Sequence, residues 1–468
     1  MGYSQCPQLA VLFFIIIKSE IFMSQSTGQG LYTEGSIWHH LIRMTASGGL
    51  GLLALFAVDL ADLFFIGLIG EQALAAAVGF AGSIMFFTQS LSIGLSIAVG
   101  ATVSRALGKN DRLKASELVT SGVIVVFLTS LVLTLVVWIY RLALLTWLGA
   151  EGETLTLASD YLAIILPSFP FLAVGMAAGG VMRAQGDAKA ALWLTLSGAL
   201  VNAVLDPLLI FGLDMGLSGA AVASVFSRLT IFVFGVYMIL YSYGLLTRPS
   251  LSYLRRDLPE LTAIAVPSVL TNLATPIGLA YVTATMAQYG DAAVAGTAII
   301  GRLQMVAFVG LFALSSVVGP IAGQNWGALH FDRVSAVFRD ALKFVALYCL
   351  VASAVLALST PLIRIAFPVS AESAELIRLF TYGLSLVYLF NGATFVTNAL
   401  FNNLGAPKAS TVFNIAKATL FTIPFVWLGS RLGGAPGVLI GQAIGAALVA
   451  IVGVLWAARW LKTLSPPQ

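Results

Sequence analysis

Four polar residues interrupt long apolar stretches of this sequence at spacings that a helix brings onto one face. Asp59 and Asp62 are three residues apart, and Asn202 and Asp206 are four residues apart. Burial disfavours the charged form of a carboxylate, and a second acid nearby disfavours it further, so such groups can take up and release protons. We therefore predict a cation-coupling site made of Asp62, Asp206, Asn202 and Asp59.

Two other roles are open for these residues. Asp206 or Asp59 would form a buried structural ion pair with Arg228, and Asn202 would then only hydrogen-bond between helices. Alternatively, oxygen atoms of Asp62, Asn202 and Asp206 would suit a sodium ion, because this cation prefers oxygen ligands.

Basic, aromatic and thioether side chains in the apolar stretches are candidates for substrate contacts. Flat organic cations stack on aromatic rings and touch polarisable sulfur atoms. The candidates are Met176, Arg228, Met305 and Phe395, and packing or lipid contact is the alternative role for the apolar ones. Arg302 and Lys417 would instead repel a cationic substrate locally or pair with carbonyl groups at helix ends.

Long membrane-spanning helices must position these side chains. Apolar residues make up 59% of the 468 residues and charged residues only 9%, so the chain cannot surround a soluble core with a polar surface. The apolar stretches are long enough to span a bilayer as helices and too continuous for the alternating pattern of a barrel. They fall at 41–69, 73–105, 116–140, 157–183, 190–212, 217–243, 261–289, 293–325, 335–360, 376–402, 409–430 and 435–461.

The two halves of the sequence repeat each other at a separation of 218 to 220 residues. Gly100 recurs as Gly319, and Gly108 recurs as Gly327. Because six spans is an even number, both halves enter the membrane from the same side, which makes the repeat parallel. We therefore predict an all-α membrane protein of twelve transmembrane helices in two six-helix lobes, related by a parallel pseudo-twofold repeat.

The predicted boundaries follow from the same pattern. They are a cytoplasmic extension at 1–40, an N-terminal lobe at 41–243, a cytoplasmic linker at 244–260, a C-terminal lobe at 261–461 and a tail at 462–468. The apolar run at 9–17 is too short to span, so we expect the extension to be dispensable up to a start at Met23.

Several motifs resemble one family of transporters. They are LADLFFIG at 60–67, NAVLDPLLIFG at 202–212 and GQNWGA at 323–328, with RAQGDAKA at 183–190. Over residues 41–461 the sequence is similar to the multidrug and toxic compound extrusion (MATE) family, in its DinF-like branch. Ser47 stands where members usually carry a proline, whereas its repeat partner Pro267 is retained.

This resemblance implies a monomeric secondary active multidrug efflux transporter of the inner membrane. Its partners would be small organic cations or amphiphiles and membrane lipids, exchanged by antiport with alternating access. Sodium-coupled members carry acids in helices seven and ten, where this chain has only Glu260 and Glu375 at the edges. We therefore expect H⁺ as the coupling ion, with Na⁺ as the alternative.

Other functional classes fit the sequence less well. A lipid-linked oligosaccharide flippase of the same superfamily would need several cationic residues for a pyrophosphate. A receptor or scaffold would give no reason for the clustered acids or the repeat. The sequence holds no catalytic triad, phosphate-binding loop or metal-ligand cluster, and its net charge of +4 is scattered. We thus expect no enzyme activity, no cofactor or metal and no nucleic-acid partner.

The distribution of Lys and Arg gives a testable topology. With the N-terminus inside, the outer segments hold only Arg141, Arg364, Arg378 and Arg431, so positive residues place both termini in the cytoplasm. We expect a cysteine introduced in 244–260 to resist a membrane-impermeant thiol reagent added to intact cells, and to react after lysis. Labelling of that cysteine in intact cells would contradict the topology.

Overall fold

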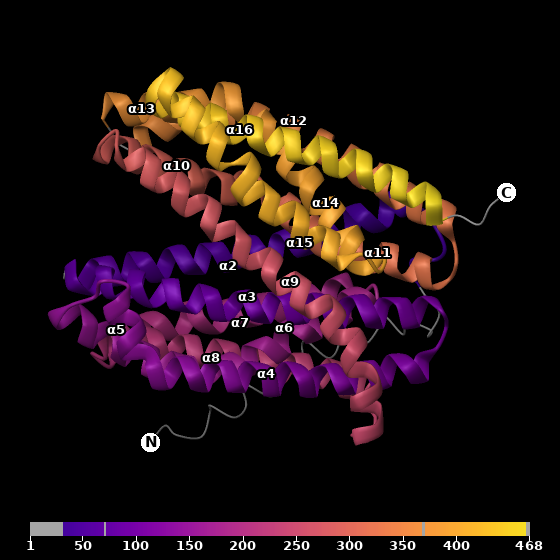
Figure 1. The fold of residues 1–468 in the computed structure, drawn as a ribbon. Helices are drawn as coiled ribbons and strands as arrows, with labels where there is room; N and C mark the ends of the chain where they lie inside the picture. Colours follow the sequence, from indigo (N-terminus) through magenta and orange to yellow (C-terminus); the bar gives the residue numbers. More distant parts are fainter. Residues whose placement is uncertain (1–30, 70–71, 367–369, 465–468) are drawn as a thin grey trace.

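The computed structural model describes residues 31–69, 72–366 and 370–464, and every regular element in this part of the chain is a helix. Figure 1 shows two helical bundles, which we call the N-terminal and C-terminal lobes. The elements of the N-terminal lobe are α2 (Ile37–Ile69), α3 (Gln72–Gly108), α4 (Arg112–Trp147), α5 (Gly152–Ile165), η1 (Leu166–Ser168), α6 (Phe169–Ala184), α7 (Ala188–Pro207), η2 (Leu208–Gly212), α8 (Gly216–Tyr237) and η3 (Met238–Ser242).

The C-terminal lobe repeats this succession of helices. Its elements are α9 (Leu251–Ala287), α10 (Asp291–Ala307), α11 (Val309–Gly327), α12 (Phe331–Ala366), α13 (Ala371–Leu379), η4 (Phe380–Leu384), η5 (Leu386–Tyr388), α14 (Leu389–Asn403), α15 (Pro407–Ala416), η6 (Lys417–Phe421) and α16 (Ile423–Leu464).

The described residues make the twelve predicted crossings. Nine helical segments are long and apolar enough to span, and two more crossings are bent, α10 with α11 by 52° and α13 with α14 by 60°. The segment Pro407–Leu464 holds two crossings, because the backbone leaves the helical conformation at Gly433 and Gly434. Gly429 then packs against Gly437, as expected where two helices run antiparallel from a reversal between them. The predicted all-α fold is therefore confirmed, with two of its spans bent.

The first helix of each lobe packs against the second helix of the other lobe. α2 lies along α11, where Gly48 and Gly49 approach Ala313. α9 lies along α3, where Gly94 approaches Val269. A twofold axis along the membrane normal exchanges these two contacts, as the parallel repeat predicts.

Two repeat-related glycines allow the lobes to touch backbone to backbone where α3 crosses α11. A Cβ atom on Gly108 would overlap the carbonyl oxygen of Gln324, and one on Gly327 would overlap that of Arg105. Arg105 and Gln324 are also repeat partners, so the contact is symmetric about the pseudo-twofold axis. Glycine is required at both positions, because only a residue without a Cβ atom lets two helix backbones approach this closely.

The start of α9 is fixed to the N-terminal lobe by a buried carboxylate. Asp257 is fully buried, and its Oδ1 accepts hydrogen bonds from Lys114 Nζ at 2.6 Å and Arg256 Nε at 3.0 Å. Its Oδ2 accepts one from Ser121 Oγ at 3.0 Å. Arg256 also pairs with Glu117 on α4. Removing one of these partners would weaken the anchor, because the buried carboxylate would lose part of its charge compensation.

The structure modifies two of the predicted boundaries. Residues 251–260, assigned to the linker, form the first turns of α9, because Asp257 anchors them to α4. Residues 32–35, assigned to the extension, contact both lobes. The proposed start at Met23 lies outside the described residues.

The glycine crossing yields a prediction about stability. Gly108→Ala would force the lobes apart at the crossing, so we expect it to lower the thermal unfolding temperature of the purified protein by several degrees. Gly82→Ala is the matched control on α3, because a Cβ atom there meets nothing within 4 Å. The control should unfold at or above the wild-type temperature, since alanine favours a helix over glycine. Equal unfolding temperatures for Gly108→Ala and Gly82→Ala would contradict the close contact.

Candidate functional site

Asn202 and Asp206 form a buried polar pair near the end of α7. Asn202 Nδ2 donates a hydrogen bond to Asp206 Oδ2 at 2.5 Å, because a spacing of four residues stacks the two side chains on one helical face. Asp206 is fully buried, and Asn202 is 5% exposed. Pro207 follows at once, and the chain continues in the π-helical turn η2, which is a common irregularity at functional sites.

The other two predicted coupling residues lie on α2. The helix runs through Asp59 and Asp62, but their side chains lie outside the part of the structure described. α2 packs along α7, with Ser47 Oγ donating to the carbonyl oxygen of Ala188. Gly51 lies next to Thr195 further along both helices, so α2 and α7 run parallel. The helices that carry the predicted acids are therefore neighbours.

Arg228 on α8 lies against the junction of α5 and α6. Its Nη1 donates to Ser168 Oγ at 3.0 Å and to the carbonyl oxygen of Ile165 at 3.2 Å. Its guanidinium lies 4.2 Å from the centre of the Phe169 ring. These contacts hold the cation inside the N-terminal lobe.

The structure does not bring the apolar substrate candidates together. Met176 is half-buried on α6, and its backbone carbonyl accepts a hydrogen bond from Ser96 Oγ. Met305 and Phe395 belong to the other lobe, where Met305 is exposed and Phe395 packs against Phe312. None of the three lines the cavity described next.

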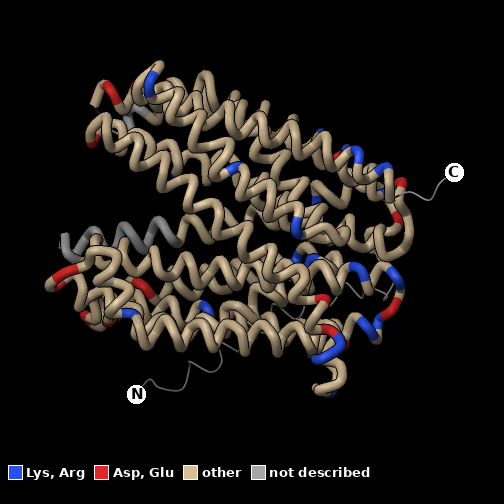
Figure 2. The backbone as a smooth tube through the Cα atoms, in the orientation of Figure 1, with Lys and Arg blue, Asp and Glu red and all other residues tan. Residues whose placement is uncertain are grey.

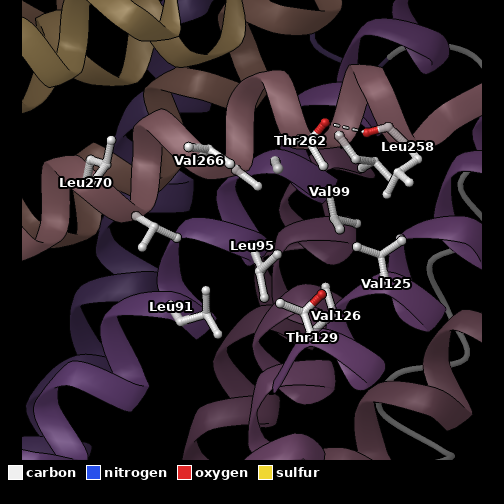
Figure 3. Close-up of a pocket in the computed structure, with 15 residues that line it drawn as sticks. Leu91, Leu95, Val99, Val125, Val126, Thr129, Leu258, Thr262, Val266 and Leu270 are labelled. Carbon is white, nitrogen blue, oxygen red and sulfur yellow. Dashed lines mark hydrogen bonds between the residues drawn. The ribbon is translucent and has the colours of Figure 1, made fainter. Parts of the chain in front are cut away.

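An apolar cavity of about 230 Å³ lies between α3, α4 and α9. Figure 3 shows Leu91, Leu95, Val126 and Leu270 among its lining side chains. Its Thr262 hydroxyl donates within α9 to Leu258. The cavity offers no charged group, so it suits an apolar moiety and cannot itself bind the coupling ion.

The basic residues expected to act in the C-terminal lobe have different surroundings. Arg302 is exposed on α10. Lys417 is half-buried, and its Nζ donates to Asn391 Oδ1 on α14 at 2.6 Å. Its partner is thus a side-chain amide, whereas the sequence left two roles open, repulsion of a cationic substrate or pairing with carbonyl groups at a helix end.

The motif GQNWGA joins the two lobes through Gln324. Gln324 Nε2 donates to the carbonyl oxygen of Ala184 in the N-terminal lobe at 2.5 Å, and Oε1 accepts from the Tyr32 amide at 2.8 Å. The next residue, Asn325, donates from Nδ2 to the Tyr32 carbonyl oxygen at 3.0 Å. The segment before α2 is therefore held between the lobes.

Arg333 and Tyr32 complete this contact. Arg333 donates to the carbonyl oxygens of Tyr32 at 2.9 Å, Gly35 at 3.1 Å and Glu34 at 3.2 Å. Tyr32 Oη donates to the carbonyl oxygen of Arg183 at 2.8 Å. Burial raises the pKa of the Tyr32 phenol above its ordinary value, so the phenol stays protonated and keeps donating at neutral pH. We call these residues the interlobe latch: Tyr32, Glu34, Gly35, Arg183, Ala184, Gln324, Asn325 and Arg333.

The latch lies at the end of the molecule where Lys and Arg gather. Figure 2 shows this concentration, and Figure 1 shows the two lobes diverging toward the opposite end. Sequence reasoning found GQNWGA only as a family motif and missed Tyr32 and Arg333. No local pattern could reveal them, because the bonded positions are 301 residues apart.

The chain matches known proteins over most of its length. The MatE family model matches residues 49–208 and 267–428. The chain is 27% identical to the FAD transporter of Shewanella oneidensis over 410 residues, which are 86% of this chain and 90% of that protein. It is 23% identical to the multidrug export protein MepA of Staphylococcus aureus over 413 residues, covering 87% and 90% of the two chains.

A solved structure shares the whole architecture. The bent form of the Vibrio cholerae MATE transporter VcmN superposes with a TM-score of 0.86 at 24% sequence identity, covering 92% of this chain and 99% of that one. At this identity the likeness establishes the fold.

Proposed function

This chain belongs to the MatE family, and we propose that it is a secondary active efflux transporter that exchanges H⁺ for small organic compounds. The buried Asn202–Asp206 pair carries the proposal. An ionisable residue inside a membrane protein is costly, so it marks a candidate site for an ion, a proton or a substrate. The relative named as a multidrug export protein supports the export of cationic or amphipathic compounds.

The coupling step requires that proton binding and substrate binding oppose each other. A proton on Asp206 removes the negative charge that attracts an organic cation, whereas Asn202 can keep its hydrogen bond to the carboxyl group. The proton must also bind one arrangement of the lobes more tightly than the other, since only such a difference drives exchange. The parallel packing of α2 on α7 supports a contribution from Asp62, with Asp59 as a further candidate.

Sodium is the alternative coupling ion. The oxygen atoms of Asn202 and Asp206 suit such a cation. Comparing an imposed pH gradient with an imposed sodium gradient in the same vesicles separates the two ions.

The lobes also require a means of opening to each side in turn. In the described arrangement the latch closes the end rich in Lys and Arg, which we assign to the cytoplasm of an inner-membrane protein with both termini inside. Rocking of one lobe against the other around the glycine crossing would then open that end. We expect a monomer to suffice, because both lobes belong to one chain.

A second substrate class has its own support. Another relative is named as an FAD transporter, and the cation Lys417 lies inside the C-terminal lobe. Compounds with acidic groups are therefore included in the proposal.

The coupling site gives a direct test. Asp206→Asn preserves the shape of the protonated acid but cannot titrate. We expect it to reduce pH-driven export of rhodamine 123 from proteoliposomes to the background of empty vesicles, with Asp62→Asn behaving alike. Glu375→Gln, which changes an exposed acid on α13, is the control and should export normally. Undiminished pH-driven export by Asp206→Asn at normal abundance would exclude proton coupling at this residue.

The latch gives a second test, which reads conformation. Gln324→Ala removes two hydrogen bonds between the lobes and the Tyr32 segment, so states open at this end should gain population by roughly tenfold. The reporter is the buried Ser104, replaced by cysteine in a chain without Cys6 and Cys349. We expect its thiol to react roughly tenfold faster in Gln324→Ala.

The matched control for the latch is Gln304→Ala on α10. It removes the same kind of side chain away from the junction, so the Ser104→Cys thiol should react at the unchanged rate. Equal labelling rates in Gln324→Ala and Gln304→Ala would show that the latch does not hold this end closed.

A further inference from the structure

Lys417 places a positive charge inside the C-terminal lobe. It is the first residue of η6, and its ammonium reaches α14, where Asn391 Oδ1 accepts its hydrogen bond at 2.6 Å. Val412 and Leu420 on the same helical segment are strongly exposed, whereas Lys417 is half-buried. The hydrogen bond to Asn391 therefore directs the lysine side chain toward α14.

No carboxylate of the described residues lies within ion-pair distance of Lys417. Two other partly buried cations differ, since Lys114 pairs with Asp257, and Arg105 pairs with Glu260 at 3.5 Å. An amide oxygen accepts a hydrogen bond but supplies no negative charge. An ammonium group has three N–H donors, so it can bind further acceptors besides Asn391. A cation in a membrane interior is kept where it meets a charge partner or a polar cavity.

Further polar side chains lie on the helices that surround Lys417. Asn391 and Asn398 are seven residues apart on α14, which places them on one helical face. Asn398 Oδ1 is buried and has no hydrogen-bond partner among the described residues; this oxygen is an acceptor, so it suits an N–H or O–H donor of a ligand and not the oxyanion itself. α15 runs back along α14 after a short turn, and its Thr411 bonds to Thr271 on α9 at 3.3 Å. Polar side chains of α9, α14 and α15 therefore lie in the same lobe as Lys417.

The backbone is irregular at the same place. η6 is a π-helical turn, and the Thr422 hydroxyl donates to the Lys417 carbonyl oxygen at 2.6 Å, five residues earlier. Such turns interrupt the regular helical hydrogen-bond pattern and recur at functional sites. The irregularity thus coincides with the buried cation and its amide partner.

We propose that Lys417 and Asn391 form a subsite for the oxyanion of a transported compound, either a carboxylate or a phosphate. The ammonium group would donate to the oxyanion and neutralise its charge, and Asn391 would orient the lysine side chain. This inference rests on the proposed export function and assigns a subsite to the acidic compounds included there. The acids lie in one lobe and this cation in the other, so the pair of lobes suits zwitterions and acidic amphiphiles.

The test compares probes that differ in a single acidic group. Rhodamine 110 carries a free carboxyl group, and rhodamine 123 is its methyl ester; FMN carries a phosphate that riboflavin lacks. Binding is measured by fluorescence with the full chain in phosphatidylcholine nanodiscs at neutral pH. We expect Lys417→Gln to weaken binding of at least one acidic probe by about tenfold or more. The affinity for the matching probe that lacks the acidic group should change by less than about twofold.

Two further variants separate charge from packing. Lys417→Arg keeps the positive charge and should keep most of the preference for the acidic probe. Lys408→Gln removes an exposed cation from the same helical segment and should leave all four affinities unchanged. A loss with FMN alone supports a phosphate subsite, and a loss with rhodamine 110 alone supports a carboxylate subsite.

The outcomes that overturn the inference are distinct from failure of the export proposal. Equal weakening of acid and ester probes by Lys417→Gln, or no weakening at all, would assign Lys417 a packing role. A preference that vanishes in nanodiscs of anionic phosphatidylglycerol would make a lipid phosphate the occupant and would also overturn the substrate subsite. Failure of the wild-type chain to bind and export any of the four probes would contradict the proposed function itself.

Discussion

The backbone contact between α3 and α11 is the constraint on which the arrangement of the lobes depends. Gly108 and Gly327 allow each helix to touch the carbonyl group of the other, and no side chain larger than hydrogen fits at either position. Because the two glycines are repeat partners, the contact lies on the pseudo-twofold axis. A rotation of one lobe against the other about this point would preserve their symmetry.

Other contacts between the lobes are arranged around this crossing. α2 and α9 each pack against the second helix of the opposite lobe, so the first helix of each lobe contacts both lobes. The buried carboxylate of Asp257 fixes the start of α9 to α4. The latch then adds directional hydrogen bonds at the same end, mostly to backbone carbonyl groups. Such bonds are individually worth about 1 kcal/mol, which suits a contact that must form and break during transport.

Charge is divided unequally between two otherwise similar lobes. The N-terminal lobe holds the Asn202–Asp206 pair, whereas the C-terminal lobe holds Lys417 beside Asn391. The pseudo-symmetry therefore concerns the backbone, and chemical specialisation is carried by single side chains. In the proposed function, this difference would place the ion site and the acidic-substrate subsite in different lobes.

The sequence by itself determined the membrane class, the twelve crossings and the parallel repeat. These follow from local hydropathy and from a constant offset between similar residues, which do not depend on contacts between distant segments. It also placed Asn202 and Asp206 on one helical face, because a spacing of four residues fixes that geometry within a single helix.

Only the tertiary structure decided how distant segments meet. Arg333 donates a hydrogen bond to Tyr32, which is 301 residues away in the sequence. The repeat-related Gly108 and Gly327 lie where two helix backbones cross. Lys417 donates its hydrogen bond to the side chain of Asn391. Such pairings depend on the relative position of whole helices, which packing sets and no local sequence pattern encodes.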